Sequence, residues 1–333
     1  MSSIRRWMSA TNKVETQPMT LNAAEAHYPS VSVVIPVYNR AAPIQACLAS
    51  LFAQTYPQTR YEIIVVDDGS TDDTAEQVRQ SAAAWNGTLR LLQKKNAGPA
   101  SARNAGIRAS EAEVIAFIDS DCLASPDWLE SLLKVLVTSD ASGVGGPLFD
   151  SSPQGWVAEY LHAASFFRHR VRHGQVEYLL TANVAFRRAA LLALHGFSER
   201  RGAWCEDADL SFRLTQAGYR LLLAEQGIVT HYGTPESIRD LSKHLYRYGY
   251  GNVMLSPHWK NGRTPLVEFI RHGGAVILSP VLALSYRRAV GIRQACSFWP
   301  LIIIEHVSFI AGLIGALVQK MIQGNQWQEA ASS

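Results

Sequence analysis

Short runs of apolar residues recur along the first third of the chain, and turn residues bound each run. The runs occupy residues 31–35, 61–66, 89–92 and 114–118. Each run has the length of a strand, and β-branched residues are common in them, which suits strands buried on both faces of a sheet. The segments between them that have helical spacing are residues 43–54, 74–84 and 100–110. Because strand and helix alternate, the pattern predicts an open, mostly parallel α/β sheet.

Three of these strands are followed by polar or acidic residues. The first is followed by residues 36–39 (PVYN), the second by residues 67–71 (DDGST) and the fourth by residues 119–121 (DSD). In sheets of this kind, ligands bind beyond the carboxyl ends of the strands. One carboxylate at a strand end is usually a turn or a helix cap, but three such clusters at one edge indicate a ligand site.

The fourth strand ends in a pair of carboxylates. Asp119 and Asp121 are two residues apart, so in extended backbone both side chains lie on the same side of the chain. Hard oxygen ligands favour Mg²⁺ or Mn²⁺ over zinc, and such an ion would neutralise charge on a diphosphate. The alternative is a capped turn that leads into a helix near residues 126–129.

Composition and charge exclude several classes of protein. The chain has 333 residues, of which 47% are hydrophobic and 18% are charged, and its formal net charge is +3. It is too apolar for a disordered tail protein, and too weakly basic for a dedicated nucleic-acid binder, so we expect no nucleic-acid partner. Its four cysteines are scattered without a CxxC pair, which indicates reduced cysteines rather than a disulfide framework or a structural zinc site.

Other ligand-binding motifs are missing from the sequence. It has no Walker loop, no Gly-x-Gly-x-x-Gly fingerprint after its first strand and no Gly-x-Ser-x-Gly elbow. P-loop hydrolysis, dinucleotide redox chemistry and α/β-hydrolase chemistry therefore lose their main support. Residues 143–146 (GVGG) are rich in glycine but fit none of these motifs, so we interpret them as a close approach of backbone beneath the site.

Five segments, read together, carry a family resemblance. They are residues 31–39 (VSVVIPVYN), 62–72 (EIIVVDDGSTD), 96–106 (NAGPASARNAG), 117–121 (FIDSD) and 206–214 (EDADLSFRL). In this order they resemble glycosyltransferase family 2, although each segment alone would be a weak signal. The resemblance covers residues 30–235 and implies an inverting enzyme with a GT-A fold, a Rossmann-like open mixed sheet flanked by helices.

The resemblance implies roles for the residues at the strand ends. Pro36 and Tyr38 would line the base pocket of a nucleotide-sugar donor, and Asp68 would bond the base or the ribose. Asp119 and Asp121 would form the Asp-x-Asp motif, which binds the diphosphate of the donor through Mn²⁺ or Mg²⁺.

Three residues elsewhere in the motifs also receive roles from the resemblance. Arg103 would brace the nucleotide site, with a packing role as the alternative. Asn183 would contact the donor sugar or the acceptor, although Thr and Ala precede it where the family usually has a Gly-rich turn. His231 would be a third protein ligand of the metal, because imidazole suits Mn²⁺; otherwise it is a bonded core or surface histidine.

Residues 204–214 have the pattern of an amphipathic helix that begins with Glu206, Asp207 and Asp209. The helix dipole favours acidic residues in a first turn, so their presence alone requires no function. The resemblance gives Asp207 the position of the catalytic base. Inversion by single displacement needs one such group to accept the proton of the acceptor hydroxyl. Glu206 is the alternative base, or it organises the acceptor.

The last third of the chain lies outside this resemblance. Residues 236–263 are basic and aromatic, which indicates either a solvated helix face or a site for an acceptor phosphate. Residues 298–318 are apolar and long enough to cross a bilayer. Their small and polar residues form one stripe that we expect to pack against protein, namely Glu305, Ser308, Gly312, Gly315 and Gln319.

The preceding apolar segment, residues 265–286, is a poorer candidate for a span. Arg287, Arg288 and Arg293 follow it, and two spans would place these arginines opposite a cytosolic catalytic domain, against the positive-inside tendency. We therefore expect one interfacial helix followed by at most one span. The alternative is a buried two-helix cap on the catalytic domain.

These observations predict four segments with distinct roles. They are a flexible arm (residues 1–29), a GT-A catalytic domain (30–235), an acceptor-side segment (236–263) and a membrane-associating helical tail (264–333). The predicted function is an inverting, metal-dependent glycosyltransferase that moves a hexose-type sugar from a nucleotide-diphosphate-sugar to an acceptor hydroxyl. We expect a glycan or lipid-linked acceptor, in bacterial-type glycan synthesis on the cytoplasmic side of a membrane.

Two other functions stay open from the sequence. One is a nucleotide-sugar-binding module without catalytic activity, which the acidic residues at positions 119, 121 and 207 argue against. The other is a nucleotidyltransferase, which would begin with a Gly-rich, basic phosphate loop where this chain has PVYN.

Overall fold

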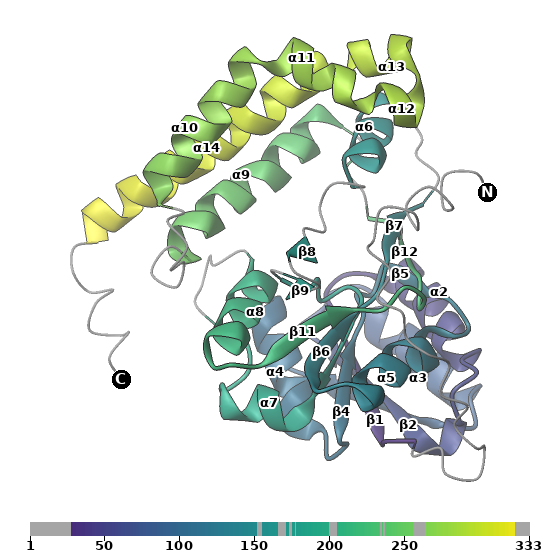
Figure 1. The fold of residues 1–333 in the computed structure, drawn as a ribbon. Helices are drawn as coiled ribbons and strands as arrows, with labels where there is room; N and C mark the ends of the chain where they lie inside the picture. Colours follow the sequence, from purple (N-terminus) through teal and green to yellow (C-terminus); the bar gives the residue numbers. More distant parts are fainter. Residues whose placement is uncertain are drawn as a thin grey trace.

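A computed structural model describes most of the chain. The described residues are 28–151, 155–165, 171–172, 175–176, 178–199, 205–233, 235, 237–255 and 264–323. The predicted N-terminal arm, residues 1–29, lies almost entirely outside them. Among the described residues, a sheet domain and a layer of helices can be distinguished (Figure 1).

The main sheet of the described chain has seven strands in the order β11-β6-β10-β4-β1-β2-β3. Their bounds are β1 Val31–Val37, β2 Tyr61–Asp67, β3 Thr88–Gln93, β4 Val114–Phe117, β6 Ala141–Gly145, β10 Val184–Arg187 and β11 Arg220–Leu223. The neighbours of β1, β2 and β3 are parallel, whereas β10 runs antiparallel to both β4 and β6. The predicted open mixed sheet is therefore confirmed.

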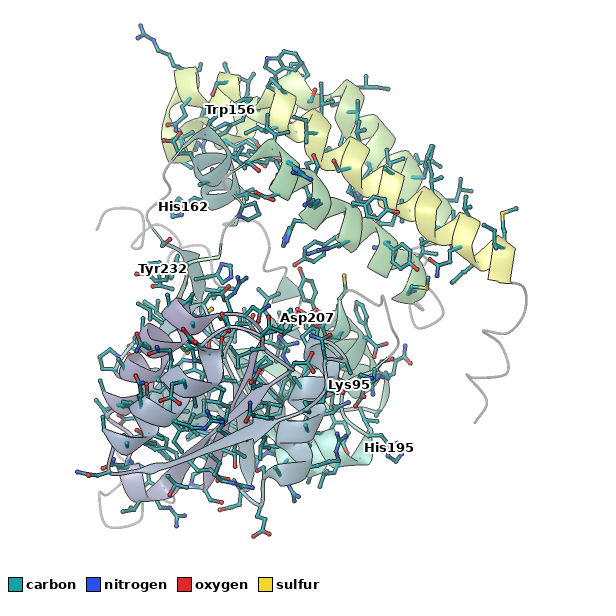
Figure 2. The ribbon with its side chains drawn as sticks, turned by 180° about the vertical axis from the view of Figure 1, so that it is seen from behind. Lys95, Trp156, His162, His195, Asp207 and Tyr232 are labelled. Atoms are coloured by element: carbon teal, nitrogen blue, oxygen red, sulfur yellow. The ribbon has the colours of Figure 1, made fainter. Side chains whose placement is uncertain are left out.

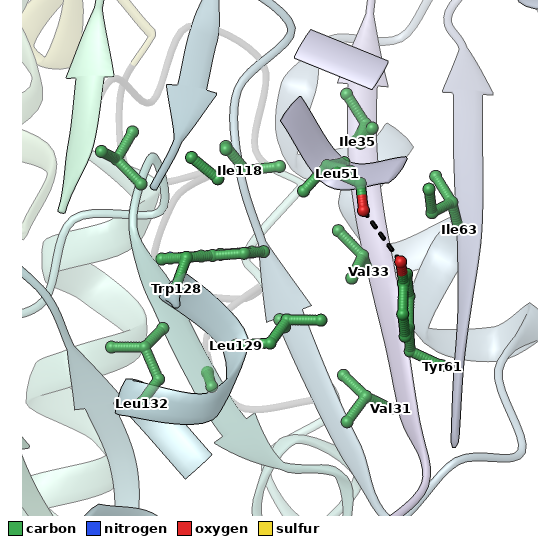
Figure 3. Close-up of a cluster of buried hydrophobic side chains, with 14 of the residues drawn as sticks. Val31, Val33, Ile35, Leu51, Tyr61, Ile63, Ile118, Trp128, Leu129 and Leu132 are labelled. Atoms are coloured by element: carbon green, nitrogen blue, oxygen red, sulfur yellow. Dashed lines mark hydrogen bonds between the residues drawn. The ribbon is translucent and has the colours of Figure 1, made fainter. Parts of the chain in front are cut away.

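Side chains that point alternately to the two faces of the sheet divide the core into two layers. Val31, Val33 and Ile35 of β1 pack on one face of the sheet, and Val34 packs on the other. Figure 3 shows the first layer, in which the Tyr61 hydroxyl donates a hydrogen bond to the Leu51 carbonyl oxygen at 2.9 Å. Residues two apart on a strand point the same way, so β1 contributes side chains to both layers.

Helices cover both faces of this sheet. They are α2 Ala41–Phe52, α3 Thr74–Ala83, α4 Pro99–Ala109, α5 Trp128–Thr138, α7 Arg188–Ala193 and α8 Glu206–Gln216. The first layer of the core includes residues of α2 and α5, and the second includes residues of α4, α7 and α8. The expectation that all four early strands are buried on both faces is wrong for β3, because β3 is the edge strand and its residues are partly or fully exposed.

A small second sheet decides the geometry of the site. Its order is β5-β12-β7, with bounds β5 Cys122–Ala124, β7 Leu148–Asp150 and β12 Val229–His231. The antiparallel pairing of β5 with β12 places His231 opposite Cys122. Since β5 directly follows the Asp-x-Asp motif, the end of β12 is brought beside that motif. A two-stranded sheet of β8 Val171–Arg172 and β9 Gln175–Val176 completes the described strands.

The remaining helices form a layer beyond one edge of the sheet domain (Figure 1). They are α6 Trp156–Ser165, α9 Ile238–Leu255, α10 Pro265–Ile277, α11 Ser279–Ala283, α12 Arg287–Val290, α13 Ile292–Ser297 and α14 Trp299–Gln323. The long helix α9 lies against α14, and α6 packs at one end through Tyr160 and Leu161, which share an apolar cluster with Leu241 and Leu301. The layer thus has its own core.

The predicted small and polar stripe of α14 does pack against protein. A Cβ at Gly312 would lie 2.0 Å from the Tyr246 carbonyl oxygen, so only glycine permits this approach of α9 to α14. The Tyr250 hydroxyl donates to Gln319 Oε1 at 2.5 Å, and the Tyr160 hydroxyl donates to Glu305. The stripe prediction is confirmed.

The opposite face of these helices is apolar and exposed. Among the described residues, Trp299–Ile322 is long and apolar enough to cross a membrane. Pro265–Ile277 and Ser279–Val290 pass the same test only as a pair that is bent by 79°. Ile277 is 80% exposed and Met321 is 82% exposed, so these helices are not buried on all sides. The break in the first segment precedes Pro280, which lies in the first turn of α11.

Candidate functional site

Part of the predicted site lies on the side of the sheet domain that faces the helical layer. Asp207 and Tyr232, the residue after His231, both lie on this side (Figure 2). The Tyr232 N–H donates to the Asp121 carbonyl oxygen at 2.9 Å, which fixes the end of β12 to the turn after β4. Two groups of side chains meet here, one around Asp121 and one around Arg103.

Asp121 and His231 form the first group. His231 Nε2 lies 3.6 Å from Asp121 Oδ1, and the two side chains are 25% and 17% exposed. One ligand atom each from Asp121, Cys122 and His231 lie within 4.8 Å of one another. Burial, and then the charges of Asp119 and Asp121, raise the pKa of the Cys122 thiol far above its usual range.

The donor atoms of this group fit a divalent cation. A carboxylate oxygen and an imidazole nitrogen, both partly exposed, are a ligand set that Mn²⁺ accepts. A Cβ at Gly233 would lie 2.5 Å from Asp121 Oδ2 and 3.1 Å from His231 Nε2. Glycine at this position therefore keeps the space beside both ligand atoms open.

Arg103 organises the second group. Its guanidinium donates from Nη2 to Asp119 Oδ1 at 2.8 Å and from Nη1 to Glu206 Oε1 at 2.6 Å. The side chain is 5% exposed and lies over the Phe197 ring at 5.7 Å from the ring centroid. One buried cation on α4 thus joins the end of β4 to the first turn of α8. Arg103 therefore connects two acidic residues, and its bracing of a nucleotide site stays a prediction.

Asp207 is the acidic residue of this group that Arg103 does not pair. Among the described residues it forms no ion pair, and its Oδ1 accepts a hydrogen bond from the Ala208 N–H at 2.8 Å. Burial, and then the adjacent Glu206 carboxylate, raise the pKa of Asp207 to about 7. A carboxyl group with a pKa near neutrality can accept a proton from a reacting hydroxyl and release it afterwards.

The third acidic residue of α8 has a structural role. Asp209 is buried, and its Oδ2 accepts a hydrogen bond from Arg213 Nε at 2.8 Å. The same guanidinium donates to the carbonyl oxygens of Leu194 and Gly196, which ties α8 to the end of α7. The three acids of one helical turn therefore have different environments.

Asp68 is buried in hydrogen bonds of the fold itself. It is 3% exposed, and its oxygens accept hydrogen bonds from Lys94 Nζ at 2.5 Å and from the backbone N–H groups of Ala97 and Gly98. Asp68 thus fixes the loop that leads into α4. That Asp68 also bonds the base or the ribose stays a prediction.

Asn183 is also buried beneath the site. Its Oδ1 accepts from Trp128 Nε1 at 2.8 Å, and its Nδ2 donates to the carbonyl oxygens of Pro147 and Gly227. With 1% exposure and these three bonds, it does not contact a donor sugar or an acceptor, which corrects that expectation. A Cβ at Gly146 would lie 2.4 Å from the Gly227 carbonyl oxygen, so the predicted close backbone approach is confirmed.

The end of β1 presents two side chains that reach solvent. Tyr38 is 48% exposed, whereas Pro36 is only partly exposed within β1. Arg40 was not among the predicted site residues, yet its Nε lies 3.8 Å from Asp121 Oδ2. Its place directly after the PVYN segment was the signal that could have identified it, because residues at that strand end face the ligand edge.

Comparison with known proteins agrees with this architecture. Residues 32–194 match the profile of glycosyl transferase family 2, and residues 114–314 match that of glycosyl transferase family group 2. Glycosyltransferase AglE of Haloferax volcanii is 32% identical over 228 residues, which are 68% of this chain and 74% of that protein. The pre-mycofactocin glycosyltransferase of Mycobacterium tuberculosis is 32% identical over 255 residues, 74% of this chain and 51% of that protein.

A solved structure shows the same fold. Mannosyltransferase PcManGT from Pyrobaculum calidifontis, in complex with GDP-Man and Mn²⁺, superposes with a TM-score of 0.63. The match covers 96% of this chain and 94% of that one at 22% identity. It therefore includes the helical layer as well as the sheet domain.

Proposed function

This chain belongs to glycosyltransferase family 2, and from that premise we propose that it is an inverting, metal-dependent transferase of a hexose-type sugar from a nucleotide-diphosphate-sugar. The observation that carries the proposal is that neighbouring acidic residues have different partners. Arg103 pairs with Asp119 and Glu206, while Asp207 remains outside both ion pairs with a pKa near 7. Asp207 can thus act as a base, whereas the charges of Asp119 and Glu206 are balanced by Arg103.

Asp207 acts as the base in this proposal. Its carboxylate accepts the hydroxyl proton of the acceptor while the acceptor oxygen attacks the anomeric carbon of the donor sugar. The bond from that carbon to the diphosphate breaks in the same displacement, which inverts the configuration. Glu206 is held by Arg103 Nη1 at 2.6 Å, so we assign it to positioning Arg103 and the start of α8.

Asp121 and His231 would hold the divalent cation, Mn²⁺ or Mg²⁺. When bound, such an ion neutralises the charge that develops on the departing nucleotide diphosphate. Asp119 Oδ1 accepts a hydrogen bond from Arg103, and the Asp119 side chain is 30% exposed. Its other oxygen can therefore bind the same ion or the donor. The Mn²⁺ in the PcManGT complex supports a metal of this kind.

Residues at the end of β1 would bind the nucleotide. The exposed Tyr38 ring would stack on a base, and the partly exposed Pro36 would line the same pocket. Arg40, beside Asp121, would face the diphosphate. The GDP-Man in the PcManGT complex supports a nucleotide-sugar donor.

The acceptor would approach from the side of the helical layer. Residues 236–263 form the proposed acceptor-side segment, and within them α9 lies between the sheet domain and α14 (Figure 1). The exposed apolar face of α10 and α14 supports a membrane-associated tail over residues 264–333. We therefore propose a glycan or lipid-linked acceptor in bacterial-type glycan synthesis. The free cysteines of the described chain fit the cytoplasmic side of the membrane, reached peripherally or through a single span.

A donor screen tests the proposal. Thermal unfolding of the full chain is followed with nucleotide-sugars in the presence and absence of Mn²⁺, because a ligand that binds the folded state raises its stability. The donor identified in this way is then used to measure transfer or slow hydrolysis by the wild type and by Asp207→Asn. Donor binding without any turnover would indicate a binding module, and no metal-dependent binding of any nucleotide-sugar would contradict the proposed site.

A further inference from the structure

A cavity of about 460 Å³ lies between α9 and α14, and its described lining includes none of Asp121, His231 and Asp207. Among the described residues it is lined by Ser242, Lys243, Tyr246, Arg247, Ser308 and Ala311. All six belong to these two helices, and none belongs to the main sheet or to α8. The cavity is therefore a separate feature of the helical layer.

Two basic residues line the cavity on its α9 side. Lys243 and Arg247 are four residues apart on one helix, so they lie on the same side of it, one turn apart. Ser242 and Ser308 add hydroxyl groups, and the described lining contains no carboxylate. Lysine, arginine and hydroxyl donors together are the groups that bind a phosphate.

The α14 wall is continuous with the exposed apolar face of that helix. Ala311 lies in one helical row with Val307, Ile314 and Val318, whose side chains are each about half exposed. Tyr246 lines the cavity and is 42% exposed, and tyrosine is enriched where a membrane meets water. A ligand that fits both walls has a phosphate next to a long apolar chain.

We propose that the groove between α9 and α14 binds an anionic membrane phospholipid, with its phosphate on Lys243 and Arg247 and an acyl chain along the Val307–Val318 row of α14. This site does not use the donor, the metal or Asp207. It would fix the depth and rotation of the helical layer in the bilayer, because one lipid contacts α9 through its phosphate and α14 through its acyl chain.

Native mass spectrometry of the full chain in detergent tests the proposal. Phosphatidylglycerol and phosphatidylcholine with identical acyl chains are titrated separately, and the bound fraction is measured for each lipid. We expect the wild type to retain phosphatidylglycerol, and the double variant Lys243→Gln/Arg247→Gln to bind it at least about tenfold more weakly. The matched control is Arg287→Gln/Arg288→Gln, which removes two basic residues of α12 outside the groove and should bind as the wild type does.

A second variant tests whether the lipid occupies the groove itself, without removing either positive charge. Ala311→Trp places a large side chain in the groove from an exposed position on α14 and leaves both basic residues in place. It should also lose phosphatidylglycerol, while circular dichroism shows the same helix content as the wild type.

Four results would overturn the lipid site. These are unchanged binding by the Lys243/Arg247 variant, an equal loss in the arginine control, equal binding of phosphatidylcholine, and displacement of the lipid by glycerol 3-phosphate at the same concentration. The last result would identify a site for soluble phosphate esters. None of these measurements involves a nucleotide-sugar, so their results do not depend on the proposed transferase activity.

Discussion

Replacing the proposed base should stabilise this protein while it abolishes transfer. Asp207→Asn removes a carboxylate whose ionised form is penalised by burial and by Glu206 in the folded chain. The asparagine Oδ1 can keep the hydrogen bond that Asp207 accepts from the Ala208 N–H. A residue whose loss raises stability but eliminates turnover is typical of a catalytic group held in an unfavourable environment.

The magnitude follows from the pKa of Asp207. Its rise from 3.8 to about 7 corresponds to about three powers of ten in proton affinity, or about 4 kcal/mol at a pH above both values. Because the folded chain binds the proton more tightly, this penalty is absent below the unfolded pKa, grows as the pH rises and is complete above about 7. Allowing for imperfect replacement by the amide, we expect a gain of about 2 kcal/mol at pH 8 and about half of that near pH 5.5.

Thermal unfolding at these two pH values measures the gain. For a chain of this size, about 2 kcal/mol raises the midpoint by about 3 °C at pH 8, and the rise should shrink at pH 5.5. Transfer should fall by about 10² to 10⁴-fold, and kcat/KM of the wild type should increase with pH through about 7 as Asp207 ionises.

Asp209→Asn is the matched control on the same helical turn. Asp209 is paired with Arg213 at 2.8 Å, so its replacement should lower the midpoint at both pH values instead of raising it. A fall of the midpoint for Asp207→Asn at both pH values, or transfer within tenfold of the wild type, would refute the reasoning about Asp207.

Three further predictions follow from other contacts in the structure. Asp121→Ala should abolish the Mn²⁺-dependent part of the thermal shift given by a bound nucleotide-sugar, whereas His195→Asn, on the far side of the sheet domain (Figure 2), should leave it unchanged. Arg103→Met should lower the free energy of unfolding by about 3 kcal/mol in chemical denaturation, because it leaves two carboxylates without their cation; a loss below 1 kcal/mol would contradict the bridge. Gly312→Leu should lower the unfolding midpoint, since a Cβ there would lie 2.0 Å from a backbone oxygen of α9, and Gly273→Leu, with open space around it, should not.

The sequence by itself determined the elements and their order. Alternating apolar runs and helical segments correspond to β1 through β4 and to α2, α3 and α4 with small shifts at their ends. The polar stripe of α14 also followed from spacing alone, because residues three and four apart share a helix face. These features depend on local periodicity, which a chain carries whatever it packs against.

The tertiary structure decided which polar groups are available. Asp68 and Asn183 carry motif positions, yet packing against the segments near residues 97 and 227 buries them in hydrogen bonds of the fold itself. Sequence spacing gives the strand end at which a side chain lies, but its exposure depends on which distant backbone covers it.

Tertiary packing also gave each acidic residue of the site a different neighbour. The β5–β12 register brings His231 to Asp121, and helix α4 supplies the single guanidinium that holds Asp119 and Glu206 and leaves Asp207 outside these ion pairs. The periodicity of the sequence predicts only that the acidic residues lie at strand and helix ends. The division between metal ligand, bridged carboxylate and base arises only when segments about a hundred residues apart pack together, because burial and Coulomb interactions depend on distances in space.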